Sequence, residues 1–147
     1  MITYLDHVGI VANSLEEAGE VLVDQLGLLY DEERTPFPKG GFFAPERTKI
    51  FFVKVNLGET RIEILLPEDN VSGIGKYLER RGPGLHHLGY GSTDVVGDTK
   101  LFMERGLSYI DFGGPIDEIT ASFFHPKTAG GILTEIVPDR RPQASGS

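Results

Sequence analysis

Apolar and polar positions recur with two different periods along the chain, and each period predicts one kind of element. Residues 4–12 alternate large apolar with small or polar side chains, a pattern typical of a strand. Residues 15–26 instead carry apolar side chains at the spacing of one helix face. Ser14 and Glu17 form a possible capping box at the start of this helix, and Gly27 follows as a C′ glycine would. The pattern therefore predicts a strand and then a helix at the start of the chain.

The same two periods predict the elements in the rest of the chain. Residues 35–47 break both periods, because they are rich in proline and glycine and also contain three phenylalanines. We expect a long mobile loop there, acting as a lid or an interface. Polar residues from 139 to 147 predict a flexible tail. Further strands are predicted at 28–33, 49–56, 60–66, 85–92, 107–112, 119–124 and 132–137, and helices at 72–81 and 95–105.

These elements repeat in order, which indicates an internal duplication. Each half is predicted to run β-α-β-β-β, with module 1 at about residues 1–70 and module 2 at about residues 83–138. A helix near 71–82 connects them. Each module alone would leave one sheet face uncovered, so the two should join around a shared core. The sequence thus predicts a single α+β domain over residues 1–140.

Histidine and glutamate recur at matching ends of the two modules. His7 lies in the first strand of module 1, and His87 lies in the first strand of module 2. Gly9 leaves space two positions after His7, and the same spacing to a glycine recurs after His87. Glu63 and Glu135 stand in the closing strands beside apolar or β-branched neighbours, where an unpaired carboxylate is costly to bury.

Each of these residues alone has an ordinary structural explanation. Strand histidines are often hydrogen bonded, and strand glutamates often face solvent. The doubling of both residue types favours a shared metal centre made of His7, Glu63, His87 and Glu135. Imidazole nitrogen together with carboxylate oxygen suits a divalent ion, with Co, Mn, Zn, Ni, Fe and Mg as candidates.

Other residues near these strands are weaker candidates for a functional site. His86 should point away from the face that His87 uses, because neighbouring strand residues alternate, so we expect it to pack or to meet solvent. Phe52 and the phenylalanine before it also point to opposite faces, which makes Phe52 a candidate cavity-lining residue. His125 belongs to a predicted loop and is expected to be structural, although it or Lys127 could contact a substrate anion.

Composition argues against several classes of function. The formal net charge of −8 disfavours a nucleic-acid partner, which needs a basic face. No apolar run is long enough to span a bilayer, so no membrane association is expected. The absence of cysteine removes disulfides, thiolate nucleophiles and cysteine–zinc sites, and it fits a cytoplasmic protein.

Five motifs resemble those of the vicinal oxygen chelate superfamily, the glyoxalase and bleomycin-resistance group. Within it, the chain is most similar to the methylmalonyl-CoA epimerases, over about residues 4–138. The segment that ends in the paired histidines is the most specific of the five. The motifs are LDHVGIV at 5–11, LGETRIEILLP at 57–67, YLERRGPGLHH at 77–87, FFHPK at 123–127 and GGILTE at 130–135.

The resemblance implies a glyoxalase-like fold, in which two βαβββ modules form a curved mixed sheet around a shared metal-binding cavity. It maps the metal ligands onto the four residues already named, and it implies a homodimer. The implied substrate is a small carbonyl compound or an acyl-CoA. Candidate substrate contacts are Phe52, Tyr90, Phe124 and Lys127.

The implied reaction is that of an epimerase or isomerase, which removes an acidic proton next to a carbonyl. A divalent ion would polarise the carbonyl, and a carboxylate would take the proton. Since the ligands themselves are the carboxylates at hand, Glu135 is the preferred base and Glu63 the second catalytic candidate.

Three departures from the epimerase pattern leave alternatives open. Residues 50–55 lack the extra strand carboxylate that some epimerases carry, residues 114–118 replace a glycine-rich turn, and the segment 35–47 is longer. The missing carboxylate favours a metal-dependent lyase, or another vicinal oxygen chelate enzyme of specialised metabolism, acting on a different carbonyl substrate. A third alternative is a resistance protein that sequesters a small aromatic molecule, which the phenylalanine-rich segment would suit.

Overall fold

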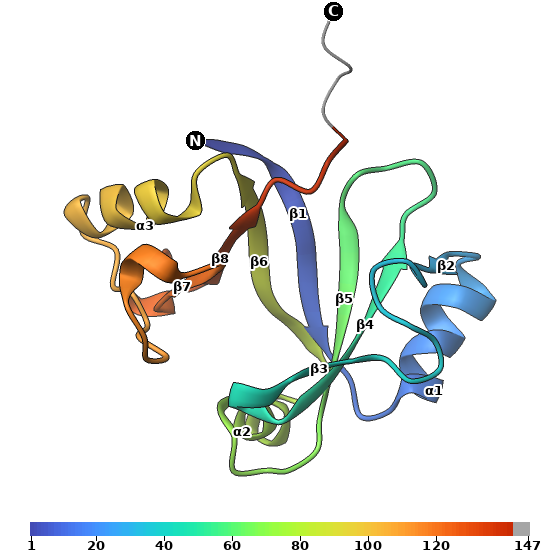
Figure 1. Cartoon of the computed structure of the whole chain (residues 1–147). Helices are drawn as coiled ribbons and strands as arrows, with labels where there is room; N and C mark the ends of the chain where they lie inside the picture. Colours follow the sequence, from blue (N-terminus) through green and yellow to red (C-terminus); the bar gives the residue numbers. More distant parts are fainter. Residues whose placement is uncertain (143–147) are drawn as a thin grey trace, which may run out of the picture. The chain divides into compact units, whose positions relative to one another are not determined.

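The computed structural model describes residues 1–142 of the chain, which divides into two compact units (Figure 1). One unit comprises residues 7–87, and the other combines residues 1–6 with the chain from residue 88 onward. The described residues form a mixed eight-stranded sheet and three α-helices, which confirms the predicted α+β class. Two strands, β1 (Ile2–Val11) and β6 (Gly84–Ser92), contribute residues to both units.

The sheet of the unit 7–87 follows the order β2-β4-β5-β1, with β3 also paired to β4. The neighbours β1 and β5 run parallel, whereas β4 pairs antiparallel with each of β2, β3 and β5. A parallel pair needs a crossover, and the helical segment and three strands between β1 and β5 supply it. The strands are β2 (Leu29–Tyr30), β3 (Gly41–Phe43), β4 (Thr48–Lys54) and β5 (Arg61–Pro67).

The register of these strands gives the sheet two chemically different faces. Gly9 of β1, Glu63 of β5 and Phe52 of β4 form one cross-strand row, so their side-chain positions share a face. His7 lies on that face because it is two positions from Gly9. The opposite face carries the residues between them, which are apolar, and it packs against the helix that follows β1.

Local signals in the sequence fix the helices of this unit. The predicted cap Ser14 accepts a hydrogen bond from the Glu17 amide at 3.1 Å, and α1 (Leu15–Gly19) continues as the π-helix η1 (Glu20–Gln25). Gly27 has a positive φ of 76°, as a C′ glycine requires. Helix α2 (Gly73–Arg81) buries Ile74 against Val11 and Leu65 on the face that holds His7. A 3-10 turn, η2 (Ala44–Glu46), precedes β4.

The other unit is built from the order β6-β8-β7 and one longer helix. Asp94 caps α3 (Val95–Glu104) by accepting a hydrogen bond from the Gly97 amide. Phe124 of β7 is fully buried, with ring contacts to Phe102 and Tyr109. The remaining elements are β7 (Ser122–Phe124), β8 (Leu133–Pro138) and the short 3-10 turns η3 (Ile116–Glu118) and η4 (Pro126–Thr128).

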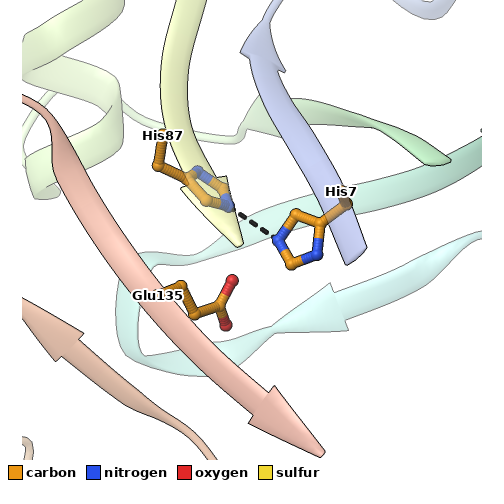
Figure 2. Close-up of side chains that lie close together, drawn as sticks. All are labelled: His7, His87 and Glu135. Atoms are coloured by element: carbon orange, nitrogen blue, oxygen red, sulfur yellow. Dashed lines mark hydrogen bonds between the residues drawn. The ribbon is translucent and has the colours of Figure 1, made fainter. Parts of the chain in front are cut away.

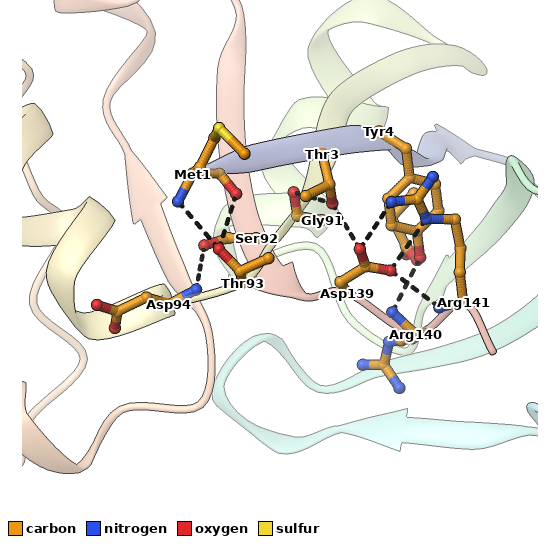
Figure 3. A network of polar contacts seen from close by, with 11 residues as sticks. Met1, Thr3, Tyr4, Gly91, Ser92, Thr93, Asp94, Asp139, Arg140 and Arg141 are labelled. Carbon is orange, nitrogen blue, oxygen red and sulfur yellow. Dashed lines mark hydrogen bonds and ion pairs between the residues drawn. The ribbon is translucent and has the colours of Figure 1, made fainter. Parts of the chain in front are cut away.

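A polar network in this unit connects the start of β1 to the residues that follow β8 (Figure 3). Asp139 accepts hydrogen bonds from the Thr3 hydroxyl and from the guanidinium and amide of Arg141. The Arg141 contacts hold the pKa of Asp139 well below its ordinary value. Arg141 also lies over the Tyr4 ring. Residues 139–141 are therefore hydrogen bonded, while residues 143–147 of the predicted tail lie outside the described residues.

Two sequence predictions about elements are wrong. Residues 107–112 form no strand: they pair with β7 at one isolated bridge, from Tyr109 to Phe124. Two backbone hydrogen bonds make this bridge, from the Ile110 amide to the Phe123 carbonyl and from the His125 amide to the Ser108 carbonyl. Conversely, the segment 35–47 is not wholly loop, since Gly41–Phe43 pairs with β4 as β3. Among the described residues, no helix is long and apolar enough to cross a membrane.

In the unit 7–87, an ion pair between Asp31 and Arg61 attaches the turn after β2 to β5. The Asp31 carboxylate accepts a hydrogen bond from Arg61 Nε at 2.8 Å and another from the Arg34 amide. Burial alone raises the pKa of Asp31, but the Arg61 and Arg34 hydrogen bonds outweigh it, so the pKa lies below the ordinary 3.8.

This depressed pKa predicts an acid-dependent contribution to stability. Asp31→Asn should lower the free energy of unfolding at pH 7 by about 1–3 kcal/mol, as for a charge-assisted hydrogen bond. The contribution is complete above the ordinary pKa and is lost as the pH falls through the lowered one, so the deficit should shrink between pH 5 and pH 3. Urea unfolding measures it, with the exposed Asp24→Asn as control. A deficit that stays constant with pH would contradict the ion pair.

Candidate metal centre

Three potential ligand atoms lie close together on the sheet face of the unit 7–87 that carries His7 and Glu63. Nε2 of His7 lies 3.0 Å from Nε2 of His87, and Figure 2 shows the two rings meeting at these atoms. Oε1 of Glu63 lies 3.2 Å from the His87 nitrogen and 3.8 Å from the His7 nitrogen. All three side chains are buried. Strands β1, β5 and β6 each contribute one of them.

These separations suit a bound divalent ion. Ligand atoms about 2.1 Å from one ion lie about 3.0 Å apart at a right angle and about 3.4 Å apart in a tetrahedron. The three observed distances fall close to that interval. The donor set also matches, because two imidazole nitrogens and a carboxylate oxygen are ordinary ligands of Zn, Mn, Fe, Co and Ni. The residues present therefore fit a metal ion.

Gly9 provides the space that His87 occupies. A Cβ atom built on Gly9 would lie 2.2 Å from Cε1 and 2.9 Å from Nε2 of the His87 ring. Those separations are far below any normal contact, so only glycine leaves the imidazole beside Glu63. The sequence predicts a gap beside an imidazole at Gly9, and the structure confirms it, although the ring comes from the other histidine motif.

The neighbouring histidine touches the site instead of only packing elsewhere. Nδ1 of His86 lies 2.9 Å from Nδ1 of His87, and the His86 ring meets the Tyr77 ring edge-on at 4.8 Å. A hydrogen bond at Nδ1 of His87 fixes which tautomer that ring adopts. If Nδ1 carries the proton, the Nε2 lone pair points at His7 and Glu63. His86 thus has a packing role, as predicted, and an additional contact with the centre.

Phe52 borders this site, and Arg34 stacks on its ring. The Phe52 ring is buried and meets the His7 ring edge-on, with centroids 5.8 Å apart, whereas Phe51 belongs to the core cluster behind the sheet. The two phenylalanines therefore divide between the faces as the alternation predicts. The Arg34 guanidinium lies 4.0 Å from the Phe52 centroid. Sequence reasoning does not find Arg34, because it stands in a turn that has no periodic pattern.

The remaining predicted site residues belong to the other unit. Glu135 lies on β8 and Tyr90 on β6, and both are half-buried. Lys127 is exposed on η4, where its amide donates to Nδ1 of His125, so His125 has the structural role expected for it. The complete burial of Phe124 favours a core role over contact with a substrate.

Comparisons with known proteins agree with this architecture. Residues 6–121 match the sequence profile of the Glyoxalase/Bleomycin resistance protein/Dioxygenase superfamily. The chain is 31% identical over 137 residues to the mitochondrial methylmalonyl-CoA epimerase of Homo sapiens, covering 90% of this chain and 72% of that protein. The predicted glyoxalase-like fold is confirmed by two solved structures.

One solved structure is the methylmalonyl-CoA epimerase from Mycobacterium tuberculosis, at 27% identity and a TM-score of 0.79, covering 95% of this chain and 90% of that one. The other is the hypothetical protein BH1468 from Bacillus halodurans C-125, at 28% identity and a TM-score of 0.76, covering 97% of this chain and 98% of that one. The comparisons thus include named epimerases and a relative without an assigned activity.

The packing of His87 against Gly9 predicts a double-mutant coupling. Gly9→Ala should destabilise the protein by about 1–3 kcal/mol, because the new methyl group overlaps the imidazole. In a His87→Ala background the overlap disappears, so the same change should cost much less. Urea unfolding of the four variants gives the coupling energy. An equal cost in both backgrounds would show that the two residues do not compete for this space.

Proposed function

Because the chain belongs to the glyoxalase/bleomycin resistance protein/dioxygenase superfamily, we propose that it is a divalent-metal-dependent epimerase or isomerase. Its reaction would remove and return an acidic proton on the carbon next to a carbonyl group. The observation that carries the proposal is the convergence of two imidazole nitrogens and a carboxylate oxygen within 3.0–3.8 Å. The names of the epimerase relatives support the same reaction class.

The proposed ligands are His7, His87, Glu63 and Glu135. The first three form the cluster of the unit 7–87. Glu135 is the fourth by the internal duplication, because it occupies in module 2 the place that Glu63 occupies in module 1, and Figure 2 draws it with the two histidines. When bound, a divalent ion supplies Lewis-acid polarisation of a carbonyl oxygen.

The proposed base is Glu135, with Glu63 as the second catalytic candidate. Glu63 is 9% exposed, and its carboxylate lies against the His87 ring, which suits a ligand that stays in place. Glu135 is half-buried, and a carboxylate with some solvent access can release the proton it takes. Phe52 next to His7 keeps water from that side of the reacting carbon.

The proposed substrate is a small carbonyl compound or an acyl-CoA thioester. The epimerase relatives are named for methylmalonyl-CoA, which makes it the first compound to try. Phe52, Tyr90 and Lys127 remain the proposed contacts with the substrate. The homodimer implied by the resemblance is likewise part of this proposal, and sedimentation equilibrium tests it.

A second candidate function rests on the composition of β4. Its residues Thr48–Lys54 include no carboxylate, and the position opposite Glu63 holds Phe52. Epimerisation requires a proton to leave one face of the carbon and return to the other, which two opposed groups do most simply. A site with one base suits a lyase or an isomerase that works on a single face. A sequestering protein is the third candidate, and the apolar surface of Phe52 favours it.

Hydrogen exchange at carbon tests the proposed reaction directly. The metal-loaded protein in heavy water should place deuterium on the α-carbon of methylmalonyl-CoA, and mass spectrometry measures the uptake. Glu135→Gln should lower the exchange rate by about 100-fold or more, because the base is lost. The variant should still bind metal, which elemental analysis after dialysis checks. Full turnover by metal-loaded Glu135→Gln would exclude Glu135 as the base.

The other results of this experiment separate the candidates. A protein that binds metal but exchanges no deuterium favours the lyase. A purified protein that holds no metal and binds aromatic ligands favours the sequestering protein. Exchange without change of configuration at the α-carbon indicates that one base works on a single face.

The contact between His86 and His87 predicts a change in metal affinity. His86→Leu removes the hydrogen-bond partner of His87 Nδ1, and we expect about 10-fold weaker metal binding, as for a lost partner of a ligand. His86→Gln keeps a polar partner and should recover part of the affinity. Competition with a colorimetric chelator measures both, and equal affinity in all three proteins would assign His86 to packing alone.

A further inference from the structure

We propose that Tyr77 of α2 is a positioning residue for the candidate metal ligand His87, and that it acts through His86. The proposal rests on the proposed metal-dependent function and adds a residue that holds one of its ligands in place. The Tyr77 ring meets the His86 ring edge-on at 4.8 Å, and Nδ1 of His86 lies 2.9 Å from Nδ1 of His87. All three residues belong to the unit 7–87.

The contact between the neighbouring histidines departs from regular strand geometry. Adjacent residues of a strand direct their side chains to opposite faces, so the rings of His86 and His87 would ordinarily lie apart. Here the ring centroids are 5.2 Å apart and the ring planes meet at 89°. The Tyr77 ring, which lies against His86, supplies a contact from outside the strand that favours this orientation.

Tyr77 also holds the main chain of the same segment. Its hydroxyl donates a hydrogen bond to the Leu85 carbonyl at 2.5 Å, and Leu85 directly precedes His86. The chain reverses at Gly82, whose φ of 72° lies in the region that favours glycine and whose amide donates to the Leu78 carbonyl. One side chain of α2 therefore contacts both the backbone and the ring of the segment that leads into His87.

The packing and capping of α2 fix the position of Tyr77. Ile74, one turn earlier, is buried in the core cluster of Val11 and Leu65, and Tyr77 packs against the same cluster. The Ile74 amide donates to the Glu46 carboxylate at 3.1 Å, which holds the first turn of the helix. Because the helix is fixed, the Tyr77 ring needs little further ordering to keep its contact with His86.

Holding a ligand ring in place before the ion arrives strengthens metal binding, because less freedom is lost on binding. A hydrogen-bond partner at Nδ1 of His87 orients its Nε2, which lies 3.0 Å from Nε2 of His7 and 3.2 Å from Oε1 of Glu63. His86 is that partner, and Tyr77 keeps the His86 ring beside it. Removal of the Tyr77 ring should therefore weaken metal binding although no ligand is lost.

The cobalt affinity of matched variants tests the proposal. In competition with a colorimetric chelator, Tyr77→Leu should bind Co²⁺ about 10-fold more weakly than wild type, because it loses the ring and the hydroxyl. Tyr77→Phe keeps the ring and should recover most of the affinity. The control is Leu78→Ala, which removes packing from the same cluster at the next position of α2 and should bind Co²⁺ as wild type does. The thermal midpoint of each variant measures the accompanying loss of stability.

Two further measurements test whether Tyr77 acts through His86. In a His86→Leu background, Tyr77→Leu should cause no additional loss of cobalt affinity, because the intermediate ring is already absent. In the metal-free protein, the nitrogen-15 NMR signal of His87 Nδ1 should shift in Tyr77→Leu and stay in place in Leu78→Ala. The NMR comparison needs no metal, so it tests the positioning role separately from the metal-dependent function.

Several results would overturn the proposal. Equal cobalt affinity in Tyr77→Leu and wild type would do so, and equal losses in Tyr77→Leu and Leu78→Ala would assign Tyr77 to packing alone. An additional loss in the His86→Leu background would show that Tyr77 does not act through His86. Failure of the wild type to bind cobalt would instead refute the proposed metal-dependent function. In that case the NMR comparison decides the positioning role, and an unshifted His87 signal in Tyr77→Leu would exclude it.

Discussion

The contact between the buried Glu63 carboxylate and the His87 imidazole is the interaction on which the unit 7–87 depends. Taking an ionised carboxylate out of water costs several kcal/mol unless hydrogen bonds or a metal ion compensate. The protein arranges that compensation through the sheet register, which sets Gly9 opposite Glu63 and so makes room for the ring. Among the described residues, no buried polar side-chain atom lacks a partner. One register thus determines both the packing of this face and its chemistry.

The same register puts the apolar core and the polar candidate site on opposite faces of one sheet. The face behind β1 and β5 is a continuous apolar layer that includes Phe51, Val53 and Ile64. The face that carries His7 and Glu63 holds the polar groups of the candidate site. At one end, Ile74 packs on Val11 and Leu65 of this face. Since neighbouring strand residues alternate between these faces, a polar site can be built without breaking the core. Phe51 and Phe52 show the principle, because one belongs to each face.

What the sequence predicted well depends on period and repetition. Strand alternation assigns His7 and Glu63 to one face, and the duplication groups them with His87; the structure brings these three side chains together. The helix cap Ser14 was predicted because the residues at helix ends have characteristic local chemistry. Residues 107–112 were assigned to a strand from their composition, but a strand also needs a partner along its length, and these residues pair with β7 at one bridge only. That His7, His87, Glu63 and Glu135 are metal ligands stays a prediction.

Arg34 shows why part of a site escapes sequence reasoning. It stands in a turn whose conformation comes from hydrogen bonds to Phe52 and Asp31, residues that are distant from it or lack any periodic relation to it. Nothing in its immediate sequence distinguishes it from the exposed arginines of α2. Its position over Phe52 follows only once β4 is paired and the turn is attached to that strand. The hydrogen bonds that attach the turn after β2 to β4 are therefore what places the Arg34 guanidinium on the Phe52 ring.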